Sequence, residues 1–126
     1  MRLLLDTHAL IWWLTDNRRL SAPARTAIAD PHNAVFASAA SGYEIANKQR
    51  LGKLPGRIAQ DLPAALRQAR IPVHPLSLNH TIVAGLLPGP HRDLWDRLIM
   101  AQAFADDLTV VSIDPIFRDY GVPTVW

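Results

Sequence analysis

The chain of 126 residues has no cysteine, only one glutamate and only two lysines. Without cysteine it forms neither disulfides nor zinc sites built on thiolates. No apolar run approaches the ~18 residues that span a bilayer, so no membrane partner is expected. The first acid, Asp6, comes too early for the residues before it to be a signal peptide. These absences lead us to expect a folded, soluble, cytoplasmic protein.

The composition predicts one globular domain over residues 1–126. Apolar residues make up 49% of the chain and charged residues 19%, which excludes a disordered protein. At this length folding buries roughly two-thirds of the surface of the unfolded chain. Eleven of the thirteen basic residues are arginine, which suits bidentate contacts with phosphate, although the net charge is only +2. On charge alone, a solvated helix face explains these residues better than a nucleic-acid surface.

Short apolar runs alternate with helical patterns along the whole chain. The runs predict strands at residues 2–5, 34–38, 73–76, 108–113 and 122–125. The patterns between them predict helices at residues 8–15, 21–30, 41–50, 57–70, 78–87 and 93–106, with Pro63 marking a break or a fresh start. This alternation is typical of an α/β fold in which helices cover both faces of a mostly parallel sheet.

Acids follow two of these strands, and two more lie about one turn into two of these helices. Asp6 ends the first apolar run, and Asp114 ends the run at 110–113. Side chains just past buried strands point out of the carboxyl edge of the sheet, where open α/β sheets bind ligands. If Glu44 and Asp96 converge there too, the four carboxylates repel one another unless cations hold them. The pattern therefore points to magnesium-dependent cleavage of a phosphodiester.

Each aspartate also has a plain structural explanation. Asp6, Asp93 and Asp114 suit helix N-caps, and an acid at Asp96 complements the helix dipole. Taken singly, capping explains each of them better than catalysis, and for Asp93 a cap and a metal ligand are equally good. Glu44 lies a turn into its helix, has no capping role, and is the only glutamate although glutamate favours helices.

Polar and basic residues surround the acids in sequence. The hydroxyls that lie within a few residues of them, and that would orient carboxylates or serve ordinary turns and strands, are Thr7, Ser38, Ser41 and Ser112. The basic residues placed to contact the phosphates of a substrate are Lys48, Arg50, Lys53, Arg92 and Arg97. The five histidines show no metal-ligand spacing, and His91 reads as a loop brace rather than a phosphate contact.

Four blocks of sequence together resemble the PIN-domain ribonucleases, specifically the VapC-type toxins of type II toxin–antitoxin systems. They are LLLDTHALIWWL at 3–14, ASAASGYEIANK at 37–48, HRDLWDRLIMAQA at 91–103 and LTVVSID at 108–114. The third block, in this order with the others, is specific to that family. Tyr43 and Leu94–Trp95 depart from common family residues, but they are not carboxylates of the motif.

The resemblance implies a PIN-like α/β/α sandwich with a mostly parallel central sheet. It assigns the catalytic, metal-binding quartet to Asp6, Glu44, Asp96 and Asp114, makes Asp93 an accompanying acid, and places Ser112 where Ser or Thr is usual. It also implies a homodimer and a cognate antitoxin whose tail fills the acidic groove. DNA would be a partner only through that antitoxin.

The sequence thus predicts an endoribonuclease that uses one or two Mg²⁺ or Mn²⁺ ions. Three alternatives remain open at this stage. A DNA or flap nuclease would use the same acids, and a catalytically silent module would only bind RNA or a protein. A metal-free ribonuclease would use histidines, although none are paired in the sequence.

Overall fold

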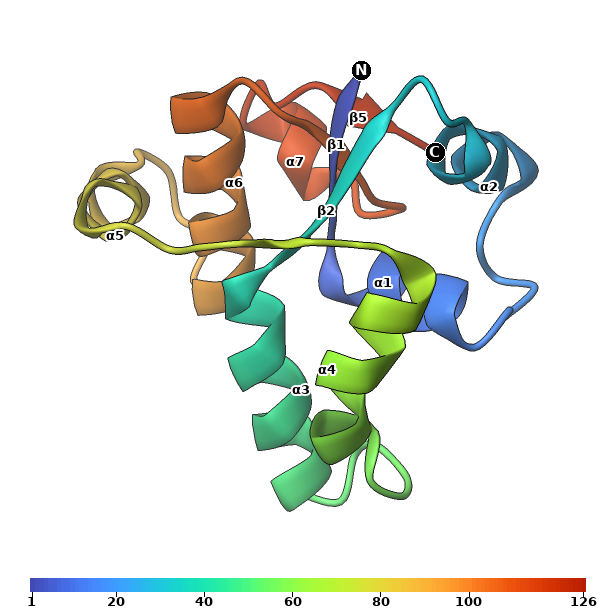
Figure 1. Ribbon diagram of the computed structural model, residues 1–126. Coiled ribbons are helices and arrows are strands. Elements are labelled where there is room, and N and C mark those ends of the chain that lie inside the picture. The colour runs from blue at the N-terminus through green and yellow to red at the C-terminus, as the bar shows by residue number, and fades with distance from the viewer.

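Five parallel strands form the centre of the molecule. The computed structural model describes residues 1–126, and Figure 1 shows its arrangement. The strands are β1 (Arg2–Leu5), β2 (Ala34–Ser38), β3 (Val73–His74), β4 (Thr109–Val111) and β5 (Thr124–Val125). They lie in the order β3-β2-β1-β4-β5, and every neighbouring pair is parallel. The prediction of a mostly parallel sheet is confirmed.

The register of the central strands aligns their carboxyl ends. Leu5, the last residue of β1, pairs with Ala37 of β2 and with Val111 of β4. The residues that follow in each strand, Asp6 and Ser112 among them, therefore reach the same edge of the sheet. The backbone amide of Asp6 donates to the carbonyl oxygen of Val111 at 3.1 Å, which holds this edge together.

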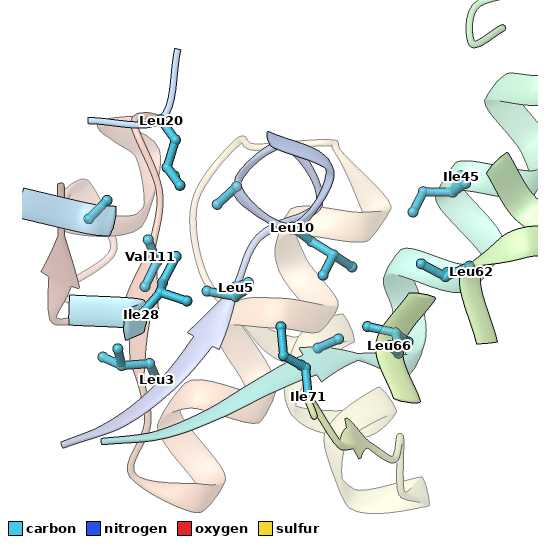
Figure 2. Packing of buried hydrophobic residues seen from close by; sticks show 13 residues of the cluster. Leu3, Leu5, Leu10, Leu20, Ile28, Ile45, Leu62, Leu66, Ile71 and Val111 are labelled. Atoms are coloured by element: carbon cyan, nitrogen blue, oxygen red, sulfur yellow. The ribbon is translucent and has the colours of Figure 1, made fainter. Parts of the chain in front are cut away.

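Helices cover both faces of the sheet. The covering elements are α1 (Thr7–Leu14), α2 (Ala22–Ala29), α3 (Ala39–Arg50), α4 (Ile58–Ala69), α5 (Leu78–Leu86), α6 (Leu94–Asp106) and α7 (Ile116–Asp119). Successive side chains of each strand point to opposite faces of the sheet, so the strands contribute residues to two separate cores. Leu3 and Leu5 belong to the core under α1, α2 and α4, shown in Figure 2, whereas Leu4 belongs to the core under α6 and α7. The predicted α/β/α sandwich is confirmed.

Two helices extend the fold beyond the carboxyl edge of the sheet. In Figure 1, α3 and α4 lie side by side and continue past the ends of β1 and β2. The expected break at Pro63 is wrong, because α4 runs unbroken through it. Leu62 and Leu66 on this helix are buried in the first core, and their packing outweighs the one backbone hydrogen bond that a proline removes.

The short helix α7 was not predicted, and the other differences from the predicted elements lie at their ends. Strands β3 and β5 have two residues each, and β4 stops at Val111 rather than at residue 113. Helix α3 begins at Ala39, two residues earlier than predicted, because Ser38 caps it. No helix combines the length and the apolar character that crossing a bilayer requires.

Candidate metal-binding cleft

A cleft of about 510 Å³ opens at the carboxyl edge of the sheet, beside α3 and the start of α6. Its charged lining comprises Asp6, Glu44, Lys48, Asp93, Asp96 and Asp114, together with His8. The structure thus brings together the four acids of the predicted quartet and the accompanying Asp93. They come from four different parts of the chain, and the parallel strand ends collect them at one place.

Two of these acids cap helices with one carboxylate oxygen, and Asp114 accepts a nearby backbone amide in the same way. Oδ1 of Asp6 accepts the amide of Ala9 at 2.8 Å, and Oδ1 of Asp93 accepts the amide of Asp96 at 3.0 Å. Oδ1 of Asp114 accepts the amide of Ile116 at 3.0 Å. Each bond occupies one oxygen, and the second oxygen is left for another partner. Capping and metal binding, which compete as explanations in the sequence, are therefore compatible in the structure.

Glu44 is held by a chain of hydroxyl groups. Thr7 Oγ1 donates to Glu44 Oε1 at 2.6 Å, and it lies 2.9 Å from Ser41 Oγ. Because the Thr7 hydrogen is directed to Glu44, Ser41 is the donor in the second contact. All three side chains are buried. Two of the hydroxyls expected to orient carboxylates thus lie where they fix the glutamate that has no capping role.

Burial shifts the acids at the base of the cleft toward their neutral form. Desolvation raises the pKa of Asp6, against the lowering effect of hydrogen bonds from Ser112 and from the Ala9 amide. Desolvation also raises the pKa of Asp96 to about 6, opposed by its hydrogen bond from His91. The charges of Asp93 and Asp114 push the Asp96 pKa in the same upward direction. Burial and the neighbouring carboxylates therefore make the ionised forms of Asp6 and Asp96 costly in the metal-free cleft.

The donor set of the cleft fits a hard divalent cation. Carboxylate oxygens are the ligands that Mg²⁺ and Mn²⁺ prefer, and Asp6, Glu44, Asp96 and Asp114 supply them from several directions. No three of these carboxylates come within 4.8 Å of one another, a separation that mutual repulsion favours. A cation would offset this repulsion and the burial of Asp6 and Asp96 together.

The residues predicted to contact phosphates have different surroundings. Lys48 lines the cleft, whereas Arg50 donates to Asn47 and is exposed. Lys53 and Arg92 are exposed and lie outside the cleft lining. The interpretation of Arg97 changes, because its guanidinium donates to backbone carbonyls in the last turn of α5 and in the segment that joins α5 to α6. Arg97 braces that segment and is not free to grip RNA.

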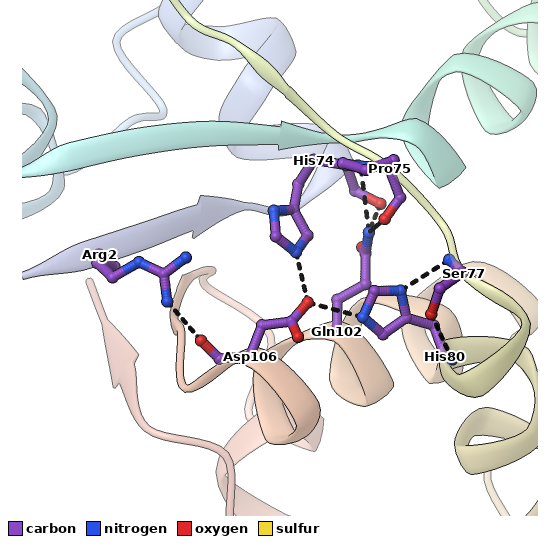
Figure 3. Close-up of polar contacts among 8 residues, drawn as sticks. Arg2, His74, Pro75, Ser77, His80, Gln102 and Asp106 are labelled. Carbon is purple, nitrogen blue, oxygen red and sulfur yellow. Dashed lines mark hydrogen bonds and ion pairs between the residues drawn. The ribbon is translucent and has the colours of Figure 1, made fainter.

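A second cluster joins residues that no sequence spacing connects. Figure 3 shows His74 of β3 and His80 of α5 meeting Asp106 at the end of α6. Asp106 Oδ2 lies 2.6 Å from His74 Nε2 and 2.7 Å from His80 Nε2, and the three atoms lie within 4.8 Å of one another. The three residues lie on three different elements, so the spacing of histidines along the sequence did not reveal this group.

The hydrogen bonds of His80 determine whether this cluster can bind a metal ion. The amide of Ser77 donates to His80 Nδ1 at 2.9 Å, so the proton of the neutral ring sits on Nε2 and is donated to Asp106. The lone pair that a metal would need on Nε2 is therefore absent. The two histidine hydrogen bonds lower the pKa of Asp106. We interpret the cluster as a clamp that ties β3 and α5 to α6.

The fold and the acidic cleft define a class of α/β protein that gathers carboxylates at the ends of parallel strands. The PIN domain family matches residues 3–123, and the chain belongs to that family. No curated protein sequence matches the chain.

Several solved structures share this fold. VapBC2 from Rickettsia felis, bound to a promoter DNA fragment, has a TM-score of 0.69 at 15% identity, covering 98% of this chain and 97% of that one. VapBC-1 from nontypeable Haemophilus influenzae has a TM-score of 0.67 at 16% identity, covering 98% and 96%. A toxin–antitoxin complex from Klebsiella pneumoniae has a TM-score of 0.59 at 22% identity, covering 90% and 87%.

Proposed function

We propose that this PIN-domain protein is a metal-dependent endoribonuclease that acts as the toxin of a type II toxin–antitoxin pair. The observation that carries the proposal is the cleft itself. It gathers five carboxylates, two of which have raised pKa values, at the carboxyl edge of the sheet. An arrangement this costly in the absence of cations is expected where cations bind.

Four carboxylates would hold one or two ions in this proposal. Asp6, Glu44, Asp96 and Asp114 would be the ligands, and Asp93 would contribute its uncapped oxygen. A bound Mg²⁺ or Mn²⁺ ion would supply Lewis-acid stabilisation of the charge that develops on the phosphodiester.

The neighbouring side chains would fix the ligands. The Thr7 hydroxyl, itself bonded to Ser41, holds one oxygen of Glu44, so that this carboxylate keeps its direction. Ser112 bonds to Asp6 and also accepts the amide of Asp114, which ties the two strand-end acids together. One of the acids, with an oxygen that binds no metal ion, would accept the proton of the attacking water.

Lys48 would give the cleft its cationic contact with RNA. Its ammonium group pairs with Glu44 and is partly exposed, so it can turn toward a phosphate once a cation neutralises the glutamate. Arg50, Lys53 and Arg92 are exposed and would contact phosphates farther along the strand. Arg97 is left out of this set, since backbone carbonyls occupy it.

The partners follow from the family and from the fold neighbours. The similar structures are named as VapBC or toxin–antitoxin complexes, which supports a cognate antitoxin for this chain as well. The antitoxin would be the component that contacts DNA, as the promoter fragment in the Rickettsia felis complex suggests. We further propose a homodimer and a cytoplasmic location for the free protein.

The other candidate functions have less support. A catalytically silent binding module would have no need to keep five acids around a cleft. A DNA or flap nuclease would share the site and differs only in substrate. A metal-free ribonuclease would need two histidines across the cleft, whereas only His8 lines it and His91 is bonded to Asp96.

The deciding experiment is cleavage of RNA and of matched single-stranded DNA by the purified protein, with and without metal. We expect RNA cleavage with Mg²⁺ or Mn²⁺, no cleavage in EDTA, and products that carry a 5′-phosphate and a 3′-hydroxyl. A 2′,3′-cyclic phosphate formed in EDTA would overturn the mechanism in favour of the histidine alternative. Equal cleavage of the DNA strand would overturn the substrate assignment.

A further inference from the structure

The segment that joins α5 to α6 is held by one cationic side chain of α6. The guanidinium of Arg97 donates to the carbonyl oxygens of Ala84 and His91, each at 3.0 Å, and also to that of Leu87. One side chain thus spans both ends of the connection. Because a guanidinium fixes its donors in one plane, the three carbonyls are held in a set geometry.

The same segment is fastened from α7 by a tyrosine. The backbone amide of His91 donates to the Tyr120 hydroxyl at 3.1 Å. Gly89 makes this contact possible, because a Cβ there would lie 2.5 Å from that hydroxyl oxygen. Gly89 also has a φ of +101°, which favours glycine in any case. The backbone at residue 91 is therefore fixed from two independent directions.

These contacts hold the imidazole of His91 against Asp96, which lines the cleft. Its Nε2 atom lies 2.9 Å from Oδ2 of Asp96, and each of the two side chains is 22% exposed. A carboxylate can only accept, so the proton is on Nε2. This is the one side-chain hydrogen bond that Asp96 makes, since the Asp93 cap holds its amide and not its carboxylate.

We propose that His91 is a positioning residue of the metal site, acting through Asp96. Its Nε2–H fixes Oδ2 of the carboxylate, and Oδ1, which has no side-chain hydrogen-bond partner, would hold a divalent cation. Arg97, Gly89 and Tyr120 keep the imidazole in place. The proposal rests on the proposed function, because it assumes that Asp96 binds a cation. Loss of such an outer partner of a ligand typically weakens metal binding by about 10- to 100-fold.

Binding of Mn²⁺ tests the proposal by isothermal titration calorimetry, with RNA cleavage measured in parallel over a range of Mn²⁺ concentrations. His91→Phe keeps a ring but removes the donor, and we expect Mn²⁺ affinity to fall by about 10- to 100-fold. His91→Gln keeps an N–H at a similar reach and should bind Mn²⁺ within about threefold of wild type. His32→Gln, which changes an exposed histidine outside the cleft, is the matched control.

The pattern across the variants separates a positioning role from others. Excess Mn²⁺ should restore most of the kcat of His91→Phe, and its melting temperature in EDTA should stay near that of wild type. Tyr120→Phe should weaken Mn²⁺ binding in the same direction but less. Wild-type affinity in His91→Phe would overturn the inference. A kcat lost in His91→Gln at unchanged Mn²⁺ affinity would also overturn it, since it would show a proton-transfer or phosphate role.

The wild type separates this inference from the proposed function. If the wild-type protein binds no Mn²⁺, the proposed function fails, and the inference falls with it. If the wild type binds Mn²⁺ and cleaves RNA while all three His91 and Tyr120 variants match it, only the inference fails.

Discussion

Lys48 lies one helical turn after Glu44, and its ammonium nitrogen is 2.6 Å from the Oε2 atom of that glutamate. The glutamate side chain is only 9% exposed, so the pair is partly shielded from water. A glutamate four residues before a lysine is the favourable order on a helix. The pair places one built-in cation in a cleft of carboxylates, where it would compete with a divalent ion for Glu44.

This pair predicts opposite effects of Lys48→Met on binding and on activity. Removing the ammonium leaves Glu44 without its competitor, so Mn²⁺ should bind more tightly than in wild type. The metal-free protein should melt lower, because the carboxylates lose their only paired cation. RNA cleavage should fall, since a phosphate contact is lost. Calorimetry and cleavage assays measure both, and unchanged Mn²⁺ affinity would remove the competition argument.

Neutralising the acids should separate ligands from accessory residues. Asp6→Asn, Glu44→Gln, Asp96→Asn and Asp114→Asn should each abolish RNA cleavage and the growth arrest caused by expression without antitoxin. The three asparagines can still accept the capping or orienting bonds, so circular dichroism should show folded proteins. Asp93→Asn should keep partial activity, because its capped oxygen is its main contact. Arrest by all four quartet variants would refute killing by catalysis.

The place of Asp6 and Asp114 at one edge of the sheet follows from simple sequence patterns. Apolar runs of strand length precede Asp6 and Asp114, and parallel strands must bring such ends to one edge. The Asp96–His91 contact was not predictable, since His91 lies in the irregular segment before α6 and four residues separate it from Asp96. Its geometry depends on Arg97 of α6 and on Tyr120 at the end of α7, which both contact the backbone of His91.

Other misses share this long-range origin. His74, His80 and Asp106 belong to three elements, and only tertiary packing brings them to one point. The helix through Pro63 depends likewise on what the helix packs against and not on its own residues. Helix start signals, which are local, placed most helices within two residues of their observed ends.

The histidine clamp should stabilise the fold and should not bind zinc. His80→Ala removes a hydrogen bond at the N-cap of α5 and the bond to Asp106, which together should cost about 2 kcal/mol. Chemical denaturation measures the loss. Added Zn²⁺ should leave the melting temperature of Asp96→Asn unchanged, because this substitution removes a carboxylate from the cleft and keeps the histidine clamp. Zinc stabilisation that disappears in His80→Ala would show instead that the clamp is a metal site.

The family resemblance implies a homodimer, and the adjacent tryptophans Trp12 and Trp13 are apolar candidates for its interface, but the structure gives that pair other contacts. Both side chains are half-buried against the first core, and Trp12 packs on Trp126 with ring centroids 5.9 Å apart. A row of exposed apolar side chains on α5, formed by Leu78, Ile82 and Leu86, remains without partner in the monomer. Light scattering on the free protein should report about twice the chain mass of 14.0 kDa. A monomer at high micromolar concentration would contradict this expectation.

The pKa of Asp96 makes the electrostatic cost of the cleft measurable as a function of pH. The folded pKa is about 6 and the ordinary value is 3.8, so between these pH values the folded protein binds more protons than the unfolded chain. The contribution of Asp96 to stability therefore falls as pH rises from about 4 through 6, and it stays low above that range. Asp96→Asn does not titrate and escapes this loss.

In EDTA, Asp96→Asn should therefore melt no lower than wild type at pH 7.5, and its advantage over wild type should shrink at pH 4.5. Saturating Mn²⁺ should reverse the order, because a ligand at a hundred times its dissociation constant stabilises by about 2.7 kcal/mol and the variant gains less. Thermal melts of both proteins at the two pH values, with EDTA and with millimolar Mn²⁺, provide the comparison. If Asp96 is only a helix-terminal acid, the variant loses a little stability and Mn²⁺ shifts both proteins equally, which would remove Asp96 from the site.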